Sequence, residues 1–264
     1  MFSFDELLCK KGKPLIMGIL NVTPDSFSDG GEAFSADSVI SKVNKLCIEG
    51  ADIIDVGACS TAPNNTIVSV EEEISRLKAF LPLVIKNSTV PVSIDTFRVE
   101  VAEYALSQGV HIINDESGVF SREMASLVKE TGCGWVFMHT GNKNSSEIGE
   151  YINGVTSDVV SFFNDMKAKS TETGLSQCQL AYDCGIGFGK SRQDDLELLA
   201  NCDILSQHSP LLVGVSRKRI IGELTGEAIP ANRVEGSVAV AKLLSEDGAG
   251  ILRVHDVKET REAI

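Results

Sequence analysis

Polar side chains recur at the ends of short apolar runs along this chain, and their types indicate two kinds of chemistry. The first group contains the short acceptors and amides Asp95, Asn114 and Asp183. Such groups suit a flat heterocycle that carries several N–H donors. The second group contains the actual or potential cations Arg217, Lys218, Arg253 and His255. Cations of this kind bind phosphate, so the residues together favour a nitrogen heterocycle with a phosphate ester as the ligand.

A simpler interpretation is that polarity returns wherever a strand ends. That interpretation explains single cases, such as His139, which could equally serve packing. It explains less well the acids set against apolar runs at Asp55, Asp95 and Asp183, because a lone buried carboxylate is costly.

The apolar runs that must position these side chains have the length and composition of strands covered on both faces. They are Pro14–Leu20, Asp52–Gly57, Val90–Asp95, Val110–Asp115, Gly134–His139, Gln179–Asp183, Pro210–Val215 and Gly250–Asp256. Amphipathic segments with helical spacing lie between them, and one of these predicted helices spans residues 194–205. One begins at a possible Ser35 cap and stops at Gly50, and another has the capping-box spacing from Ser69 to Glu72.

Strand and helix patterns that alternate eight times predict an α/β fold, a single (β/α)8 TIM barrel over residues 1–264. A doubly wound open sheet is the alternative, and it fits this repeat count less well. In a barrel of this kind the active site lies at the carboxyl ends of the strands. Every predicted strand delivers a polar or charged side chain to that rim.

Composition narrows the function classes. The 264 residues are 43% hydrophobic, and the formal net charge is -13 with a pI near 4.8. So acidic a surface disfavours nucleic acid and anionic lipid as partners. The seven cysteines contain no C-x-x-C pair, which fits free thiols in a reducing cytoplasm. We expect no signal peptide and no membrane span, since no run of about 18 apolar residues occurs.

The glycine-rich stretch from Gly185 to Ser191, "GIGFGKS", is similar to a phosphate-binding loop but is one residue short. It also follows the sixth strand rather than the first. We therefore favour a tight loop whose glycines let a planar ligand lie against backbone, over a nucleotide-hydrolase loop.

The motifs quoted in order resemble the dihydropteroate synthase family of pterin-binding barrels. They are "IMGILNVTPDSFSDGG", "GADIIDVG", "VSIDT", "IINDESG", "DCGIGFGK", "LVGVSRK", "EGSVAVA" and "LRVHDVKET". The resemblance runs from about Lys13 to the last residue. It implies an enzyme that joins p-aminobenzoate to a (hydroxymethyl)dihydropterin pyrophosphate, giving dihydropteroate and pyrophosphate in folate biosynthesis. It also implies small-molecule substrates, Mg²⁺, sensitivity to sulfonamides and a homodimer.

The resemblance also implies roles for particular residues. The pterin would be held by Asp95, Asn114, Asp183 and Lys218. The pyrophosphate and its Mg²⁺ would be held by Asn21, Arg253 and His255. The p-aminobenzoate would lie near Thr61, Pro63, Phe188 and Ser216. A loop after Asn21 would close over the site and bring Phe27 and Asp29, whose carboxylate would stabilise a pterin cation.

The chain departs from the family pattern in its loops. The second loop usually reads S-T-R-P-G, but residues 60–64 read S-T-A-P-N, so Ala62 replaces an arginine. Cys59 stands where glutamate is common, and residues 138–142 lack the second arginine of M-H-M-R-G. Lys190, Arg219, Arg253 or His255 could supply the missing charge.

Two other functions compete with an active synthase. A pterin-binding methyltransferase domain would use the same barrel, but it has no pyrophosphate to bind. A non-catalytic pterin-binding relative would be marked by the missing arginines.

Overall fold

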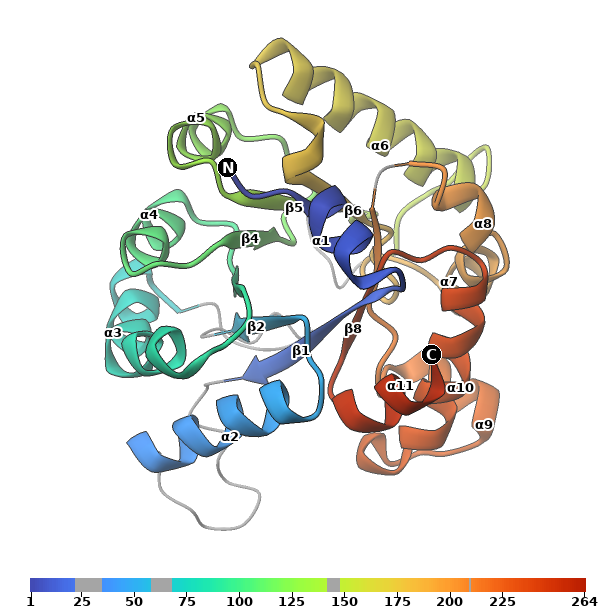
Figure 1. Ribbon diagram of the computed structural model, residues 1–264. Coiled ribbons are helices and arrows are strands. Elements are labelled where there is room, and N and C mark those ends of the chain that lie inside the picture. Colours follow the sequence, from blue (N-terminus) through green and yellow to red (C-terminus); the bar gives the residue numbers. More distant parts are fainter. Residues whose placement is uncertain (22–34, 58–67, 142–147, 209) are drawn as a thin grey trace.

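The computed structural model describes residues 1–21, 35–57, 68–141, 148–208 and 210–264. Its strands pair in sequence order, each parallel to its neighbours, and the first closes on the eighth (Figure 1). Helices surround this closed barrel (Figure 1). The predicted (β/α)8 barrel is therefore confirmed, and the open sheet is excluded.

All eight strands lie within or next to the predicted apolar runs. They are β1 (Leu15–Asn21), β2 (Ile53–Gly57), β3 (Val92–Asp95), β4 (Ile112–Asp115), β5 (Gly134–Met138), β6 (Leu180–Asp183), β7 (Leu211–Val213) and β8 (Ile251–Val254). Most are shorter than predicted. β7 ends at Val213, so Ser216 and Lys218 lie in the turn that follows it, and His255 lies just past β8.

The helices alternate with these strands. They are α1 (Phe4–Lys11), α2 (Ala36–Ile48), α3 (Val70–Asn87), α4 (Val99–Ser107), α5 (Arg122–Thr131), α6 (Val155–Glu172), α7 (Arg192–Ala200), α8 (Cys202–Leu205), α9 (Arg219–Thr225), α10 (Val234–Glu246) and α11 (Val257–Ala263), with short 3-10 turns at Gln177–Gln179 and Pro230–Asn232. None of the helices within the described ranges is both long and apolar enough to cross a membrane.

The helix starts follow the capping rules that the sequence suggested. The Ser35 hydroxyl accepts the N–H of Ser38 at 3.2 Å, and the Ser69 hydroxyl accepts that of Glu72 at 3.2 Å. The Glu72 carboxylate instead accepts a hydrogen bond from Arg76 at 2.9 Å. Ser69 thus caps α3, while Glu72 stabilises the next turn of the same helix.

Two helices were not expected from the sequence, and one expected helix is divided. α1 precedes the first strand, and α9 follows the turn after β7. The predicted helix over residues 194–205 is broken at Asn201 into α7 and α8. Asn201 has a non-helical ψ of 28°, and its side-chain amide donates to the Glu197 carbonyl at 2.7 Å. This local bond competes with helix continuation.

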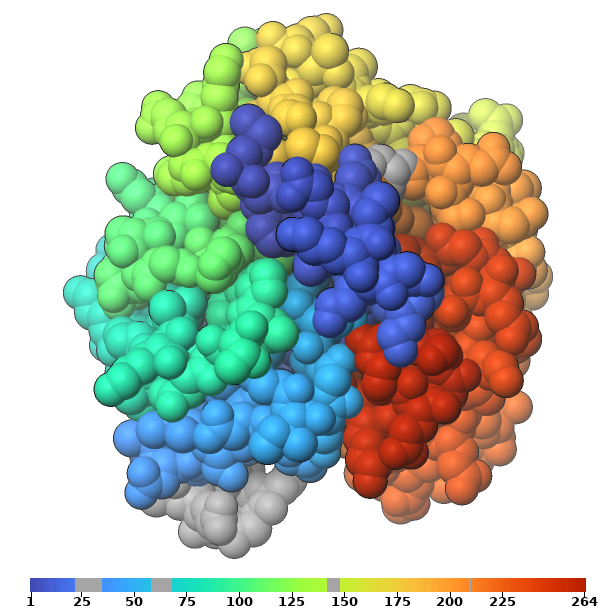
Figure 2. Space-filling model, in the orientation of Figure 1, coloured from blue at the N-terminus to red at the C-terminus, as the bar shows by residue number. Residues whose placement is uncertain are grey.

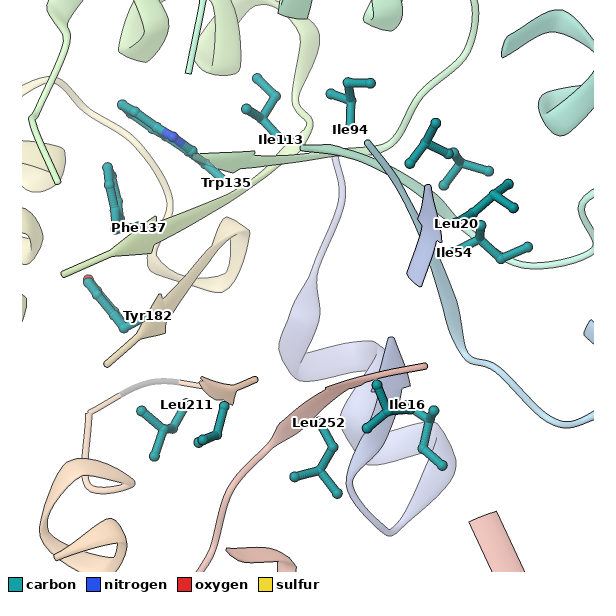
Figure 3. Packing of buried hydrophobic residues seen from close by; sticks show 14 of the residues in the cluster. Ile16, Leu20, Ile54, Ile94, Ile113, Trp135, Phe137, Tyr182, Leu211 and Leu252 are labelled. Carbon is teal, nitrogen blue, oxygen red and sulfur yellow. The ribbon is translucent and has the colours of Figure 1, made fainter. Parts of the chain in front are cut away.

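The outward faces of the strands make the larger core. Side chains such as Ile54, Ile94, Trp135, Tyr182 and Leu252 point away from the ring of strands toward the helices (Figure 3). Their exposed fractions are at most 1%. Because side chains alternate along a strand, the residues between them point into the barrel.

A second, smaller core fills the barrel interior near the amino-terminal ends of the strands. Its members come from seven of the strands and from α1, namely Phe4, Leu15, Met17, Ile53, Ile112, Val136, Ala181, Leu212 and Ile251. α1 lies across the end of the barrel that faces the viewer, and the N-terminal segment covers the middle of that face (Figures 1 and 2). Phe4 is fully buried there. The amino-terminal end of the barrel is therefore closed by Phe4 of α1, a helix that precedes the eight strand–helix units.

Replacing Phe4 by alanine should remove that closure. We expect Phe4→Ala to lower the free energy of unfolding by about 3–5 kcal/mol, as for other buried aromatic residues cut to alanine. Urea unfolding followed by circular dichroism measures this. Ile48→Ala is the matched control, since Ile48 is 85% exposed on α2 and should change stability little. A Phe4→Ala effect as small as the control's would contradict the proposed closure.

Candidate active site

Strand alternation builds the polar rim directly above this smaller core. Ile53, Ile112, Ala181 and Ile251 lie in that core, and two residues further on come Asp55, Asn114, Asp183 and Arg253. Residues i and i+2 of a strand point to the same face. These polar side chains therefore enter the barrel mouth one layer above the apolar residues. The period of two alone places them together.

Arg253 connects the acids of this layer. Its Nε donates to Asp55 Oδ2 at 2.7 Å, and its Nη2 donates to Asp95 Oδ2 at 2.7 Å. Asn114 Nδ2 also donates to Asp55 Oδ2, at 3.2 Å. The Arg253 side chain is only 15% exposed, and the two carboxylates are more deeply buried still. Strands β2, β3, β4 and β8 are thus joined by one charged network.

The network shifts its members' pKa values in opposite directions. Burial alone would lower the pKa of Arg253, but Asp55, Asp95 and Glu116 outweigh it and raise the pKa. Burial, followed by the negative charge of Glu116, raises the pKa of Asp95 well above its usual value, although Arg253 opposes this. The Arg253 guanidinium therefore stays charged, whereas burial and the charge of Glu116 make the charged form of Asp95 costly.

Three acceptors at this rim have no partner within the described part of the chain. They are the Oδ1 atoms of Asp55, Asp95 and Asn114, all buried. Buried oxygens of this kind are normally hydrogen-bonded, and leaving them unpaired is costly. The three atoms are therefore suited to a ligand that brings N–H or O–H donors.

Asp183 and Lys218 form the other half of the rim. The Asp183 Oδ1 accepts the N–H of Gly185 at 2.7 Å. Lys218 Nζ donates to the Ile186 carbonyl at 2.7 Å and lies 4.7 Å from the ring centroid of Phe188. Burial raises the pKa of Asp183 and lowers that of Lys218, and each charge partly offsets the shift of the other. A carboxylate, an ammonium and an aromatic ring thus line one wall.

The glycine-rich loop after β6 is folded inward by Lys190. The Lys190 ammonium donates to the carbonyls of His139 at 3.1 Å, Gly185 at 2.9 Å and Phe188 at 3.1 Å. An ammonium has three hydrogens, so these carbonyls use all of them. Burial lowers the pKa of Lys190 to about 8. The lysine holds its own loop rather than a phosphate, which rules out both a nucleotide-hydrolase loop and a free charge here.

Arg233 fixes the turn after β7 through hydrogen bonds to its carbonyls. Arg233 Nη1 donates to the carbonyls of Arg217 at 3.0 Å and Lys218 at 3.2 Å. Arg217 has a φ of 59°, which is rare for a residue with a side chain. Its N–H bonds the Ser237 hydroxyl at 2.9 Å, and its guanidinium pairs with Asp256. These contacts fix an unfavourable backbone conformation that sends Lys218 into the barrel mouth.

Ser216 and His255 meet at the edge of this turn. The Ser216 hydroxyl accepts the N–H of His255 at 3.2 Å and lies 3.1 Å from its Nδ1. The tautomer of His255 decides whether the hydroxyl donates to Nδ1 or accepts from it, and in the second case its hydrogen is available to a ligand. Desolvation, then Arg217 and Arg253, lower the pKa of His255 to about 4, although its ring is exposed at the rim. A bound anion would offset those neighbouring cations.

The predicted site residues fall into three groups. Asp95, Asn114, Asp183, Phe188, Ser216, Lys218, Arg253 and His255 meet at the barrel mouth as expected. Asn21 ends β1 with its residue exposed. Phe27, Asp29, Thr61 and Pro63 lie outside the described residues, so their predicted roles stay predictions.

Three further residues shape the site without having been predicted to belong to it. Asp55 had been noted only as an acid set against an apolar run, and it now forms the centre of the Arg253 network. Glu116 faces Arg253, and Arg233 fixes the turn that carries Lys218. For Asp55 the strand period was a usable signal, because it follows the inward Ile53 by two residues. Glu116 follows the end of β4 and Arg233 precedes α10, so the strand period gave no signal for either residue.

His139 serves packing, which resolves an ambiguity of the sequence. Its Nε2 lies 2.9 Å from Asp158 Oδ2 of α6, and its ring packs edge-on against Phe162. Burial, followed by the charge of Lys190, lowers the pKa of His139 to about 4. The ring is thus neutral at physiological pH and oriented away from the rim.

Comparison with known proteins agrees with this geometry. The family model described as pterin binding enzyme matches residues 17–255. The dihydropteroate synthase of Escherichia coli is 39% identical over 253 residues, which is 95% of this chain and 89% of that protein.

Solved structures give the same result. Dihydropteroate synthase of Xanthomonas albilineans with 4-aminobenzoic acid superposes with a TM-score of 0.88 at 38% identity, covering 95% of this chain and 90% of that one. Dihydropteroate synthase of Clostridium difficile in the presence of pteroic acid also gives 0.88, at 35% identity over 95% and 94%.

A closed parallel barrel with an acid- and amide-lined mouth, matched along most of its length by that family model, defines a pterin-binding enzyme. Within that class, the chain belongs to the dihydropteroate synthase family.

The loop after β6 offers a test of this architecture at Gly185. Its φ is +66°, and a Cβ there would overlap the backbone oxygen of His139. Gly12, with a φ of +64°, would place a Cβ in open space among the described residues, so it is a matched control. Both alanine variants should lose roughly 1–2 kcal/mol for the left-handed backbone.

Gly185→Ala should lose about 1–3 kcal/mol more than Gly12→Ala, because the overlap forces the loop or β5 to move. Urea unfolding of the two variants and the wild type gives the difference. Equal losses would show that the loop has room at Gly185 and that Lys190 does not hold it tightly.

Proposed function

We propose that this barrel condenses a (hydroxymethyl)dihydropterin pyrophosphate with p-aminobenzoate to give dihydropteroate and pyrophosphate, as a transferase of folate biosynthesis. The observation that carries this proposal is the set of unpartnered Oδ1 acceptors of Asp55, Asp95 and Asn114. An aminopyrimidinone ring presents several N–H donors along one edge. Such an edge would satisfy these buried oxygens.

The pterin would lie between the two halves of the rim. Asp95 and Asn114 would accept from one side of the ring and Asp183 from the other. Lys218 would donate to a ring oxygen or nitrogen, because its bond to the Ile186 carbonyl uses one of three ammonium hydrogens. Burial of all these groups would strengthen each bond.

The p-aminobenzoate would bind toward the glycine-rich loop. Phe188 offers an aromatic ring beside Lys218, and Ser216 offers a hydroxyl to the carboxylate. The Xanthomonas albilineans relative was solved with 4-aminobenzoic acid, which supports this substrate class. Thr61 and Pro63 would complete the pocket by family resemblance.

The leaving group would sit near Arg253 and His255. Arg253 Nη1 lies 3.9 Å from Glu116 Oε1, which is too far for a hydrogen bond, so this nitrogen could bind a phosphate oxygen. The exposed amide of Asn21 is the kind of hard oxygen ligand that Mg²⁺ takes. Mg²⁺ commonly takes one or two protein ligands and fills its remaining sites with water and substrate phosphate, and a single asparagine fits that mode. The ion would neutralise charge on the departing pyrophosphate.

The residues then act in sequence. The C–O bond to pyrophosphate breaks, its electron pair leaves with the pyrophosphate oxygen, and positive charge remains on the pterin methylene. The amine nitrogen of p-aminobenzoate forms the new C–N bond and loses a proton. By family resemblance Asp29 would stabilise the cation, and Phe27 would cover it. Arg253 and His255 would hold the leaving anion.

The competing functions are less well supported. A methyltransferase domain on this barrel would have no pyrophosphate to bind, yet Arg253, His255 and the "SRK" turn lie together at the rim. A non-catalytic relative would keep pterin affinity without turnover. We further propose a homodimer, by family resemblance, and a cytoplasmic location, which fits the free cysteines among the described residues.

Pyrophosphate release on mixing both substrates tests the function. The purified protein with Mg²⁺ should release pyrophosphate and form dihydropteroate in equal amounts, and neither substrate alone should suffice. Pterin binding without pyrophosphate release would support the non-catalytic alternative instead.

Asp183→Asn should weaken pterin binding. The variant keeps the shape but loses a charge-assisted hydrogen bond worth about 1.5–3 kcal/mol, so we expect the Kd for pteroate to rise roughly ten- to a hundredfold. Calorimetry measures this. Asp165→Asn removes an exposed aspartate on α6 and is the matched control. An Asp183→Asn affinity like the control's would remove Asp183 from the site.

Ala62→Arg should raise turnover and leave pterin affinity nearly unchanged. Among the cations that the structure describes near the rim, Lys190 is held by carbonyls, Arg217 by Asp256, and Arg253 by two acids. An added arginine that acts in the transition state would contribute about 1.5–3 kcal/mol, or roughly ten- to a hundredfold in rate.

Steady-state kinetics with separately measured pteroate affinity would show the effect of Ala62→Arg. Ala62→Gln, which adds bulk and donors without charge, is the control. Turnover equal to or below that of the wild type would show that the loops of this chain do not need the arginine.

A further inference from the structure

Glu116 brings an additional acid into the barrel mouth. It follows the Asn114–Asp115 end of β4, and its side chain is only 7% exposed. Its Oε1 lies 3.9 Å from Arg253 Nη1, which is within ion-pair range but too long for a hydrogen bond. Glu116 is therefore an ion-pair neighbour of Arg253 at the barrel mouth.

The backbone on both sides of Glu116 is fixed. Asp115 Oδ1 accepts the N–H of Ser117 at 2.9 Å, and Asp115 Oδ2 accepts the indole N–H of Trp135 at 3.3 Å. The Thr96 N–H bonds the Asn114 carbonyl at 3.1 Å. The direction of the Glu116 side chain is thus set by the end of β4 and by its neighbours.

The charge of Glu116 is felt throughout the site. It raises the pKa of Asp95 second only to burial, and it contributes to the raised pKa of Asp183. It also favours the charged forms of Lys218 and Arg253. Repulsion among these acids is relieved by any positive charge placed between them.

Among the residues that the structure describes, the formal charges in the mouth do not balance. Four acids, Asp55, Asp95, Asp183 and Glu116, face two cations, Lys218 and Arg253. Of the other described cations nearby, Arg217 is paired with Asp256, whereas Lys190 keeps its charge while it binds carbonyls, so the four acids still outnumber the cations by one. The pocket therefore presents a net negative field in a place with little water, where such a field acts strongly.

We propose that Glu116 is a catalytic carboxylate that stabilises the positive charge left on the heterocycle when pyrophosphate departs. This role rests on the proposed function. It belongs to the bond-breaking step, in which the electron pair of the C–O bond leaves with pyrophosphate and the pterin methylene becomes cationic. Glu116 accepts no proton and forms no covalent bond. Its charge lowers the energy of the pterin cation more than that of the neutral pterin ring in the substrate or the product.

If Glu116 has this role, its loss should affect cation formation, binding of the product and binding of pyrophosphate differently. Loss of the Glu116 charge should slow cation formation, leave the neutral product ring bound almost as before, and favour an anion near Arg253. A residue that only holds Arg253 in place would instead weaken the anion. A residue that only shapes the pocket would weaken the product.

The test compares Glu116→Gln with the wild type in Mg²⁺-containing buffer. We expect the single-turnover rate of dihydropteroate formation to fall about tenfold or more, by analogy with loss of one preorganised electrostatic contact. The Kd of pteroate should change less than about threefold, and that of inorganic pyrophosphate should stay equal or tighten. Glu130→Gln, which removes an exposed glutamate on α5, is the control and should leave all three unchanged.

A second variant separates charge from shape. Glu116→Asp keeps the charge and should retain more of the wild-type rate than Glu116→Gln, with circular dichroism melting used to check that both fold. An unchanged rate in Glu116→Gln would overturn the proposal. So would a pteroate affinity that falls as much as the rate, a weaker pyrophosphate affinity, or an Asp variant as slow as the Gln variant. A wild-type protein that forms no dihydropteroate would instead show that the proposed function itself fails, and the role of Glu116 with it.

Discussion

The guanidinium of Arg253, held between Asp55 and Asp95 in the mouth of the barrel, is the interaction on which the rest of the site depends. Several acids in a place with little water would repel each other and would favour protonation. Arg253 stabilises their charged forms through two 2.7 Å bonds from β8 to acids on β2 and β3. Removing either partner of such a pair leaves a buried charge without compensation. The arrangement fixes which oxygens remain for a ligand, because Oδ2 of each acid is used and Oδ1 is not.

The floor and walls around this network are rigid for separate reasons. Toward the amino-terminal end of the barrel, Phe4 and the inward apolar residues fill the interior, so the acids cannot move deeper. Beside it, two buried cations bind backbone instead of acids: Lys190 gathers the loop after β6, and Arg233 gathers the turn after β7. Because these cations bind carbonyls, they shape the loops and leave Oδ1 of Asp55 and of Asp95 without a partner among the described residues. The same use of cations explains why Lys190 is no substitute for the missing loop arginine.

Much of this could be predicted from the sequence, and the reason is the strand period. The alternation places Asp55, Asn114, Asp183 and Arg253 on the inward face two residues past apolar positions, and Asp95 two residues past Ser93 on the same face. Parallel strands bring their carboxyl ends to one rim. Short-range capping signals at Ser35 and Ser69 likewise predicted the starts of two helices. What depends on contacts between distant segments could not be found in this way. The closure by Phe4, the break between α7 and α8, and the carbonyl contacts of Lys190 and Arg233 are examples, as is the direction of Glu116. The roles of Phe27, Asp29, Thr61 and Pro63 remain predictions.

The most direct measurement of the central claim is a double-mutant cycle on Arg253 and Asp55, using urea unfolding of Arg253→Met, Asp55→Asn and the double variant. Each single change should cost about 3–5 kcal/mol, because it leaves one buried charge or its partner unpaired. The double variant should be much more stable than the sum of the two losses predicts, with a coupling energy of at least about 2 kcal/mol. Losses that simply add would show that the two side chains do not depend on each other, and that Arg253 does not organise the barrel mouth.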